Sequence, residues 1–379
     1  MKILFAVHTY YPDKNGVQMV TEYLAEGLAK HHEVLVITEK KDRADDNVYN
    51  GVQIKRIRVY KRGFSFLGDR AVYLNLIKEW KPDVFVCVCT QVWTFDWLWG
   101  KMDDLPCRSV LYTHGYSGFL DYYPLWEDLR RGKFRAFHYH YYWKRYYDRA
   151  WKLMRKFQAV IHLSGGNVSS RYSLEHGIGN NFFMENAVED VFFSMKEKRI
   201  GTEIRFLYVA NYDDNKNHRM VLEAFAHAAI PNTSLVLAGA GEEAYYRMLC
   251  KRLDELKRVK KDLHIEIAYQ ITRNEVYSLF ENSHVFLCGS KKEQFPLMLC
   301  EAAAASMAVV STAVGHASSM PGLLIANTEE EMAGQISFLV KDPEMLIDRG
   351  RKLRQYAKEH YKRENKITQF EKILLDVKG

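Results

Sequence analysis

Cysteine is scarce in this sequence, and the few cysteines present form no metal-ligand or disulfide pattern. Six occur among 379 residues, and no two are spaced as C-x-x-C. Cys87 and Cys89 lie within the apolar run VFVCVC, which is typical of a buried strand. We therefore expect reduced cysteines that serve packing, as in a cytosolic protein, and this excludes a disulfide-stapled scaffold.

Long apolar runs are absent as well. None reaches the roughly 18 residues that a membrane-spanning helix needs. The opening MKILFAVH turns polar after a handful of apolar residues, so we expect no signal peptide. The expected location is the cytoplasm, and any membrane contact would be peripheral, at the inner face of the cell membrane.

Neither sign of charge is in large excess. Lys and Arg number 54 and Asp and Glu 47, which gives a formal net charge of +7. This surplus is too small to predict a nucleic-acid partner, and we expect none. It does suit a phosphorylated ligand or an anionic membrane surface.

The sequence is rich in short apolar runs that alternate with amphipathic stretches, which is typical of β-α units around a parallel sheet. The runs expected to form strands are KILFAVH, EVLVIT, DVFVCVC, SVLYTHG and AVIHLS in the first half and IRFLYVAN, TSLVLAG, LHIEIAY, HVFLCGS and MAVVST in the second. A polar stretch from Glu189 to Thr202 separates the two sets. The predicted fold class is α/β, with doubly wound Rossmann-like domains at 1–188 and 189–359. A helix at about 360–379 is expected to pack back on the first domain.

Polar residues follow most of the predicted strands. In open parallel sheets, ligands bind beyond the carboxyl ends of the strands, so function is expected there. The positions concerned are His8, 113–115, Ser164, 211–216, 239–241 and 290–295. They are rich in histidine, glycine, serine and charge.

The most informative segment is EQFPLMLCE, which runs from Glu293 to Glu301 after the predicted strand HVFLC. Pro296 suits the first position of a helix, where its missing N–H costs nothing. Free N–H groups near Leu297 and the helix dipole would favour an anion at that end. The two glutamates would then accept hydrogen bonds from hydroxyls on either side of a diphosphate. The structural alternative is an amphipathic helix with two solvated glutamates.

This segment resembles the E-x7-E motif of the retaining glycosyltransferases with the GT-B fold, the family 4 type. The resemblance implies that Glu293 contacts the donor sugar and Glu301 the ribose of a nucleotide-sugar. It also implies that the backbone at Phe295 and Leu297, on either side of Pro296, faces the sugar-phosphate. The implied donor is a UDP- or GDP-linked sugar, and the implied acceptor is a glycan or a lipid-linked molecule.

Other segments carry the same resemblance over nearly the whole chain. In HTYYPDKNGVQMV, Gly16 matches one glycine of the family's Gly-Gly loop, where the backbone approaches the diphosphate. In YTHG, His114 takes the place of a histidine that lines the active site near the donor sugar. In VANYDDNKN, Lys216 matches a lysine that binds the diphosphate, whereas Asn211 replaces the family's arginine. ENAVEDVFF resembles the family's hinge between two facing domains.

The implied reaction is sugar transfer with retention of anomeric configuration, with His114 and Glu293 as catalytic residues, in the synthesis of a cell-surface polysaccharide or glycolipid. The first domain would bind the acceptor and the second the donor. The D-x-D motif of metal-dependent transferases is absent, so we expect neither a metal nor another cofactor. Lys216 and the helix N-terminus near Leu297 would neutralise the diphosphate instead.

Several positions depart from the family pattern and leave alternatives open. Ser306 and Ala308 replace the Gly and Pro of A-x-G-x-P-V-V, and Ser319 replaces the acid of G-G-x-x-E. One alternative is a non-catalytic partner that binds a nucleotide-sugar or glycan, and another is a nucleotide-sugar epimerase. The sequence GAGEEA, starting at Gly239, also mimics a dinucleotide fingerprint, but no well-placed acid follows about 20 residues later.

The segment from Tyr122 to Phe157 is unusually aromatic and basic. Thirteen of its 36 residues are aromatic, and it contains ten Lys or Arg but only three acidic residues. Aromatic residues recur there at helical spacing and form one stripe, with most of the cations off it. We expect either a helix that packs on the first domain or a surface that meets anionic headgroups or a lipid-linked acceptor. The residues assigned to that surface are Tyr142, Trp143, Lys144, Arg145 and Trp151.

Overall fold

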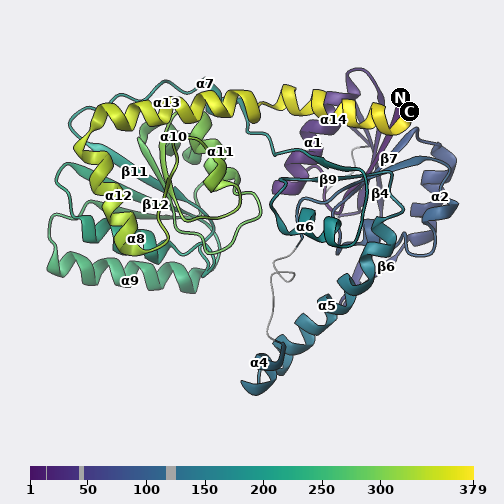
Figure 1. Cartoon of the computed structure of the whole chain (residues 1–379), viewed down its shortest axis with the longest axis horizontal. Coiled ribbons are helices and arrows are strands. Elements are labelled where there is room, and N and C mark those ends of the chain that lie inside the picture. Colours follow the sequence, from purple (N-terminus) through teal and green to yellow (C-terminus); the bar gives the residue numbers. More distant parts are fainter. Residues whose placement is uncertain (14, 42–46, 117–124) are drawn as a thin grey trace. The chain divides into compact units, whose positions relative to one another are not determined.

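The computed structural model describes residues 1–13, 15–41, 47–116 and 125–379. These form two compact units, which we call the N-terminal and C-terminal units (Figure 1). The N-terminal unit comprises Met1–Glu185 together with Glu364–Gly379, and the C-terminal unit comprises Asn186–Arg363. The chain thus passes from one unit to the other at residue 186, close to the break expected at 189.

The N-terminal unit is built on a sheet that has eight strands among the described residues, in the order β10-β9-β8-β7-β1-β2-β4-β3. The strands are β1 (Lys2–Ala6), β2 (Glu33–Glu39), β3 (Val48–Tyr49), β4 (Val52–Ile57), β7 (Val84–Val88), β8 (Arg108–Tyr112), β9 (Ala159–His162) and β10 (Asn181–Phe183). Neighbours pair in parallel except β3 with β4. The strand order therefore reverses between β1 and β7, as in a doubly wound sheet.

Helices and one hairpin complete the N-terminal unit. The hairpin pairs β5 (Val59–Arg62) with β6 (Ser65–Gly68). The helices are α1 (Gly16–Ala29), α2 (Arg70–Trp80), α3 (Trp93–Asp96), the 3₁₀ turn η1 (Met102–Asp104), α4 (Leu125–Arg130), α5 (Phe134–Met154), α6 (Val168–Glu175) and α14 (Arg363–Lys378). Figure 1 shows α4 and the start of α5 projecting away from the sheet of their own unit.

The C-terminal unit has a parallel sheet in the order β13-β12-β11-β14-β15-β16. Its strands are β11 (Ile204–Val209), β12 (Thr233–Gly239), β13 (Ile265–Tyr269), β14 (Val285–Cys288), β15 (Ala308–Ser311) and β16 (Leu324–Ile325). Its helices are α7 (Asp190–Ser194), α8 (His218–Ala228), α9 (Glu243–Val259), α10 (Arg273–Asn282), α11 (Leu297–Ala304), the 3₁₀ turn η3 (Ala317–Ser319), α12 (Glu329–Lys341) and α13 (Pro343–His360). Here the strand order reverses between β11 and β14.

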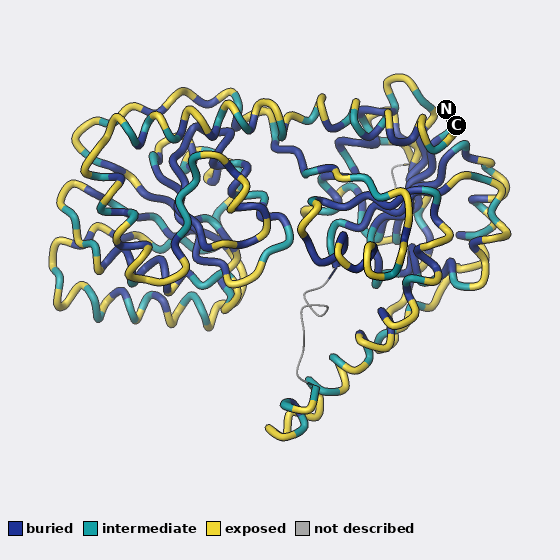
Figure 2. The backbone as a smooth tube through the Cα atoms, viewed as in Figure 1, coloured by how far each residue is buried: buried dark blue, intermediate teal, exposed yellow. Residues whose placement is uncertain are grey.

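The strands form because continuous apolar runs bury both faces of each sheet under helices. Figure 2 shows the central strands buried and the outer helix faces exposed. All ten predicted strands are present. The predictions missed β4, whose burial alternates along VQIKRI, the hairpin strands β5 and β6, and the short strands β3, β10 and β16. The α/β class is confirmed.

The C-terminal helix α14 packs on the N-terminal sheet, as predicted. The Phe370 ring lies 5.9 Å from the rings of both Phe5 and Tyr112. A Cβ on Gly27 of α1 would lie 2.4 Å from Ile367 Cδ1, so glycine lets α1 and α14 approach closely. The last turns of the chain are therefore part of the N-terminal core.

Candidate active site

Two loops of the C-terminal unit meet where its strand order reverses. β11 and β14 are neighbours in the sheet, but the chain leaves β11 for β12 on one side and later returns to β14 on the other. The carboxyl ends of these strands lead into loops 211–217 and 289–296. Ligands of doubly wound sheets bind at such a reversal. The two loops therefore form the candidate site.

Hydrogen bonds hold the two loops side by side. Asn215 donates from Nδ2 to the Lys292 carbonyl (3.0 Å) and accepts at Oδ1 from the Lys292 N–H (3.1 Å). The Tyr208 hydroxyl, buried in β11, donates to the Lys216 carbonyl (2.7 Å) and lies 3.1 Å from Ser290 Oγ. These bonds fix the register of one loop against the other.

Lys216 and Glu293, one from each loop, form an ion pair. Their side chains are only 17% and 15% exposed, so water and salt screen the pair little. The Lys216 N–H donates to Asp213 Oδ1 at 2.8 Å, which fixes the backbone below the cation. The residues predicted to contact the diphosphate and the sugar of a donor are thus brought together.

Helix α11 begins next to this pair, at Leu297. The prediction that Pro296 is the first helical residue is wrong by one position, because the Pro296 backbone is extended (ψ 101°) and caps the helix instead. The first N–H groups of any helix lack helical acceptors, and the helix dipole adds positive potential there. The start of α11 can therefore bind an anion.

Phe295 packs below the start of α11. Its ring stacks on the His316 ring, with centroids 3.9 Å apart. A Cβ on Gly315 would lie 2.6 Å from Pro296 Cδ, so glycine allows the loop that carries His316 to approach. Burial lowers the pKa of His316 to about 4, so the imidazole is neutral at pH 7. The Phe295 side chain is therefore a packing group.

Glu301, in α11, already has a partner. Arg273, the first residue of α10, donates to Glu301 Oε1 at 2.5 Å and also pairs with Glu189, which caps α7. The Arg273 guanidinium lies 5.3 Å from the Phe192 ring and 5.1 Å from the Tyr277 ring. Burial raises the pKa of the Glu301 carboxyl, while Arg273 acts in the opposite direction. Arg273 therefore fixes the orientation of the Glu301 carboxylate and favours its charged form.

His114 and Gly16 belong to the N-terminal unit. His114 follows β8 with a left-handed backbone (φ +50°), and its ring lies 3.9 Å from that of Tyr112. Burial lowers the pKa of His114 to about 3, and its Nε2 has no hydrogen-bond partner within the described residues. Gly16 opens α1 after Asn15, whose Oδ1 accepts from the Gln18 N–H at 2.9 Å. Both follow strands of the sheet, where ligands of such folds bind.

Two family models match the chain and together span most of it. The model described as Glycosyltransferase Family 4 matches residues 14–166, and the model described as Glycosyl transferases group 1 matches residues 190–360. The second match includes both loops of the site and α11. The chain belongs to the family 4 glycosyltransferases.

One relative of this family 4 member has a named activity. It is N-acetyl-alpha-D-glucosaminyl L-malate synthase from Bacillus anthracis, which is 28% identical over 181 residues. The match covers 45% of this chain and 45% of that protein, so it spans less than half of the relative's length.

Solved structures share the fold along nearly the whole chain. HepE from Anabaena, in complex with UDP, has a TM-score of 0.75 at 13% identity and covers 99% of this chain and 100% of its own. Sucrose-phosphate synthase from Thermosynechococcus elongatus has a TM-score of 0.70 at 16% identity, with 99% and 98% covered. At these identities the likeness shows the fold alone, and it confirms the predicted GT-B architecture.

Asn211 stands where the family has an arginine, and in this family 4 member it is exposed. The turn from Gly239 to Gly241 packs beside it. A Cβ on Gly239 would lie 1.8 Å from the Ala210 carbonyl oxygen, and one on Gly241 would lie 2.9 Å from the Tyr212 nitrogen. The close approach of two loops therefore explains these glycines, and no dinucleotide is needed to account for them.

The surface predicted on α5 is mostly buried. Trp143 lies in the core, so its assignment to a surface is wrong. Tyr142 is half-buried and stacks on Phe64, with ring centroids 4.1 Å apart, and Trp151 is also half-buried. Only Lys144 and Arg145 are exposed. The stripe of large aromatic residues faces the core because it carries the most apolar area. Residues 122–124 of the predicted segment lie outside the described residues.

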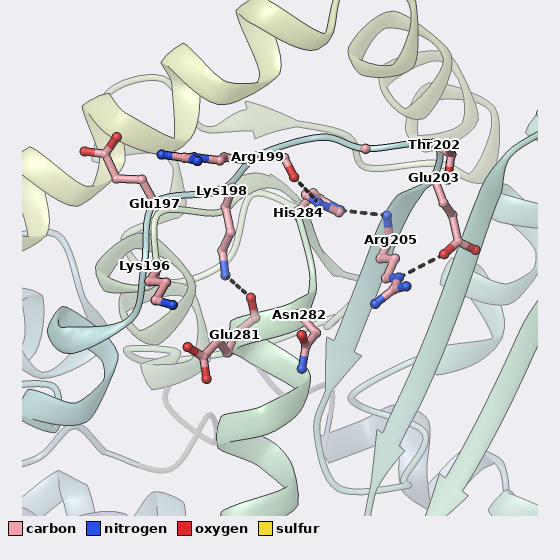
Figure 3. Close-up of a pocket in the computed structure, with 11 residues that line it drawn as sticks. Lys196, Glu197, Lys198, Arg199, Thr202, Glu203, Arg205, Glu281, Asn282 and His284 are labelled. Atoms are coloured by element: carbon pink, nitrogen blue, oxygen red, sulfur yellow. Dashed lines mark hydrogen bonds and ion pairs between the residues drawn. The ribbon is translucent and has the colours of Figure 1, made fainter.

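A hollow of the C-terminal unit, of about 500 Å³, lies at the opposite, amino ends of β11 and β14 (Figure 3). Some of its charged groups hold the segment before β11 in place. Lys198 donates to the carbonyls of Phe280 and Glu281 at the end of α10, and Arg205 pairs with Glu203 at 2.8 Å. This hollow is distant from the loops of the candidate site along the strands, and its contacts explain it as a structural anchor.

Sequence reasoning missed Arg273, Glu189 and His316. The first two are joined by a contact across 84 positions, which no local pattern reveals. From the sequence, Glu189 is only part of the hinge segment. His316 follows Gly315, whose φ is +55°. Its place directly after a glycine of the G-G-x-x-E-like segment is the one feature of the sequence that indicates a position near the site.

Proposed function

We propose that this family 4 glycosyltransferase transfers a sugar from a nucleotide-sugar to a glycan or lipid-linked acceptor, with retention of anomeric configuration. The observation that carries the proposal is the half-buried Lys216–Glu293 pair beside the start of α11, at the strand-order reversal of the C-terminal unit. Retention rests on the resemblance of the E-x7-E segment to the retaining family, and no enzymic nucleophile is assigned.

The charges of the site suit a diphosphate leaving group. Lys216 and the N–H groups near Leu297 supply fixed positive potential, and such preorganised charge stabilises negative charge that develops during bond cleavage. Glu293, released from Lys216 by the incoming diphosphate, would accept hydrogen bonds from the sugar hydroxyls. Glu301 would accept them from the ribose. We propose that these groups act without a metal ion, since the sequence contains no D-x-D.

We propose UDP or GDP as the nucleotide of the donor, and HepE, solved with UDP and with UDP-glucose, supports the first. His114 and Gly16 would serve the same reaction from the N-terminal unit, which we propose as the acceptor-binding unit. A neutral imidazole at His114 can donate or accept a hydrogen bond without adding charge near the sugar. The product would be a cell-surface polysaccharide or glycolipid, made in the cytoplasm at the inner face of the membrane.

Calorimetry with UDP and GDP tests the site directly. Lys216→Ala should weaken binding of the preferred nucleotide by about ten- to a hundredfold, the usual worth of a hydrogen bond to a charged group. Glu293→Gln should leave that affinity unchanged or raise it, because it frees Lys216. It should nevertheless lower turnover about a hundredfold. Lys291→Ala is the matched control, because Lys291 pairs with Asp214 in the same loop region at 2.7 Å and is exposed.

Equal nucleotide affinity in Lys216→Ala and the native chain would contradict the assignment. A measurement of turnover distinguishes the proposed transferase from a non-catalytic partner. The exposed Asn211 and the missing acid at Ser319 are the features that would favour such a partner. Tight nucleotide binding with neither transfer nor donor hydrolysis would favour that second function. His114→Ala should lower turnover while nucleotide affinity stays at the native value, because His114 lies outside the C-terminal unit.

A further inference from the structure

Most of the large aromatic residues that are exposed in the N-terminal unit lie at the end of a projecting element, and Tyr60 and Phe183 are exposed elsewhere in that unit. We define the arm as α4 and the first turns of α5, residues 125–141, which extend away from the sheet of that unit (Figure 1). Four large aromatic side chains of the arm are exposed: Trp126 (77%), Phe134 (70%), Tyr141 (47%) and Tyr139 (45%). Single exposed aromatics are ordinary on protein surfaces, but four within 16 residues need an explanation.

The arm is held together by hydrogen bonds, and the helix that carries it is bonded to the core of the N-terminal unit. Asp128 of α4 accepts from His140 of α5 at 3.0 Å, and the Lys133 N–H donates to the Asp128 carbonyl at 2.8 Å. Further along α5, the Tyr146 hydroxyl donates to Asp96 Oδ1 at 2.7 Å and accepts from the Gln91 N–H at 3.0 Å. The arm is thus anchored in the core at one end and exposed at the other, as Figure 2 shows.

Positive charge accompanies the aromatic residues. From Leu125 to Arg145 there are six Lys or Arg and two acids, a net charge of +4, against +7 for all 379 residues. One acid pairs with Arg131, and the other is the buried Asp128. Arg130, Lys133 and Arg135 are exposed, and no ion pair is found for them within the described residues. The arm therefore presents unneutralised cations beside its aromatic rings.

One face of α5 continues this pattern toward its root. Phe134, Tyr141, Arg145 and Lys152 are seven, four and seven residues apart, so they lie along one side of the helix, and all four are exposed. The opposite side holds the buried stripe with Trp143 and Tyr147. The exposed face is aromatic near the tip and basic nearer the core.

We propose that the arm binds the surface of an anionic lipid bilayer. Tyr and Trp favour the headgroup region, where an apolar ring and a polar edge are both accommodated, and Lys and Arg are attracted to anionic lipids. The exposed rings would enter the headgroup region while Arg130, Lys133 and Arg135 contact lipid phosphates. Within the described residues, no helix combines the length and apolar character needed to cross a bilayer. This inference does not require sugar transfer.

Sedimentation of the full chain with vesicles tests the proposal. The chain should bind vesicles of phosphatidylcholine mixed with phosphatidylglycerol, and bind phosphatidylcholine alone at least tenfold more weakly, with the difference lost in high salt. Arg130→Glu with Lys133→Glu should lower the partition coefficient about tenfold or more, given the attraction of each cation to an anionic surface. Trp126→Ser with Phe134→Ser should lower it also at high salt, where the apolar contribution remains.

Lys251→Glu with Lys261→Glu makes the same charge change on exposed residues of the C-terminal unit and should leave partition within about twofold of native. Binding that survives both arm variants, or that the control variant reduces equally, would overturn the proposal. So would a dimer in sedimentation velocity that Trp126→Ser with Phe134→Ser converts to a monomer, because a second copy would then cover the arm. Native UDP or GDP affinity in the arm variants would show that the catalytic proposal stands apart from this result.

Discussion

Arg273 holds two carboxylates from different helices, and one of them is the proposed ribose ligand. Arg273→Ala would leave Glu301 buried without a cation, and since burial already raises the pKa of that carboxyl, its pKa would rise further. A protonated Glu301 accepts hydrogen bonds poorly. We therefore expect UDP or GDP affinity to fall about tenfold, and to fall further at pH 6 than at pH 8, because a lower pH favours the protonated carboxyl. Calorimetry at the two pH values measures both effects.

A merely structural role for Arg273 predicts a different result. Affinity would then fall equally at both pH values, together with the melting temperature. Arg273→Lys keeps the charge but cannot bridge two carboxylates with a planar fork, so it should give an intermediate loss with little pH dependence. The 2′,3′-dideoxy nucleoside diphosphate is the matched ligand. Because it lacks the ribose hydroxyls, its affinity should be indifferent to all three side chains at this position.

Ser306 carries a backbone conformation that suits glycine. It follows the capping residue of α11 at φ +60°, where its N–H donates to Ala303 and the Met307 N–H donates to Ala302, each at 3.0 Å. This pair of bonds is the Schellman termination, whose left-handed residue is usually glycine. Ser306→Gly should therefore raise the free energy of unfolding by about 1 kcal/mol, because the left-handed strain of a side chain is relieved. Urea denaturation measures it, with Ser306→Ala as a control that keeps the strain and should show no gain.

At the scale of whole elements, the sequence predicts most strands correctly and leaves the orientation of one helix open between packing on the core and facing a membrane. The ten predicted strands are continuous apolar runs, which only a sheet covered on both sides can bury. β4 escapes prediction because its outward residues Gln53 and Lys55 interrupt the apolar run. On α5, periodicity reveals an aromatic stripe but cannot tell whether a stripe of tyrosine and tryptophan faces core or solvent, since both side chains have a polar edge.

Helix α13 packs tightly on the segment that follows α11, and glycine makes this possible. A Cβ on Gly350 would lie 2.3 Å from the Ser306 carbonyl oxygen, which is backbone and cannot move aside alone. Gly350→Ala should therefore lower the free energy of unfolding by about 1–3 kcal/mol, as overpacking does. Gly334→Ala in α12 is the matched control, since nothing lies within 4 Å of its Cβ position. That change should stabilise by up to about 1 kcal/mol through helix propensity. Equal shifts of the two denaturation midpoints would contradict this packing.

At the scale of the whole molecule, topology accounts for the part of the site that the sequence predicts. Lys216 and Glu293 are 77 positions apart, yet both follow strands that flank a reversal of strand order, and that rule alone brings them together. Arg273 follows no such rule, because its position at Glu301 depends on how the start of α10 meets α11. Chain topology therefore predicts residues beyond strand ends, whereas contacts between helices emerge only from the packed structure.

The free energy of unfolding of the whole chain should depend on pH through the buried histidine His218. Its ring lies between Tyr208 and Tyr212, 4.6 Å from each, and burial, together with the Lys216 charge, lowers its pKa to about 3. The folded chain therefore keeps His218 neutral, whereas the unfolded chain protonates it below the usual histidine pKa of 6.5. Because the unfolded state then binds more protons, stability is lost as the pH falls below 6.5.

Between pH 7.5 and 5.5 the loss of stability from His218 is about 1.4 kcal/mol. His218→Phe should remove this loss, so the free energies of unfolding of native and variant, measured in urea, should converge by this amount at pH 5.5 relative to pH 7.5. His227→Phe, on the exposed side of the same helix, should keep the native slope, and a parallel pH dependence for native and His218→Phe would show that the buried imidazole is not the source.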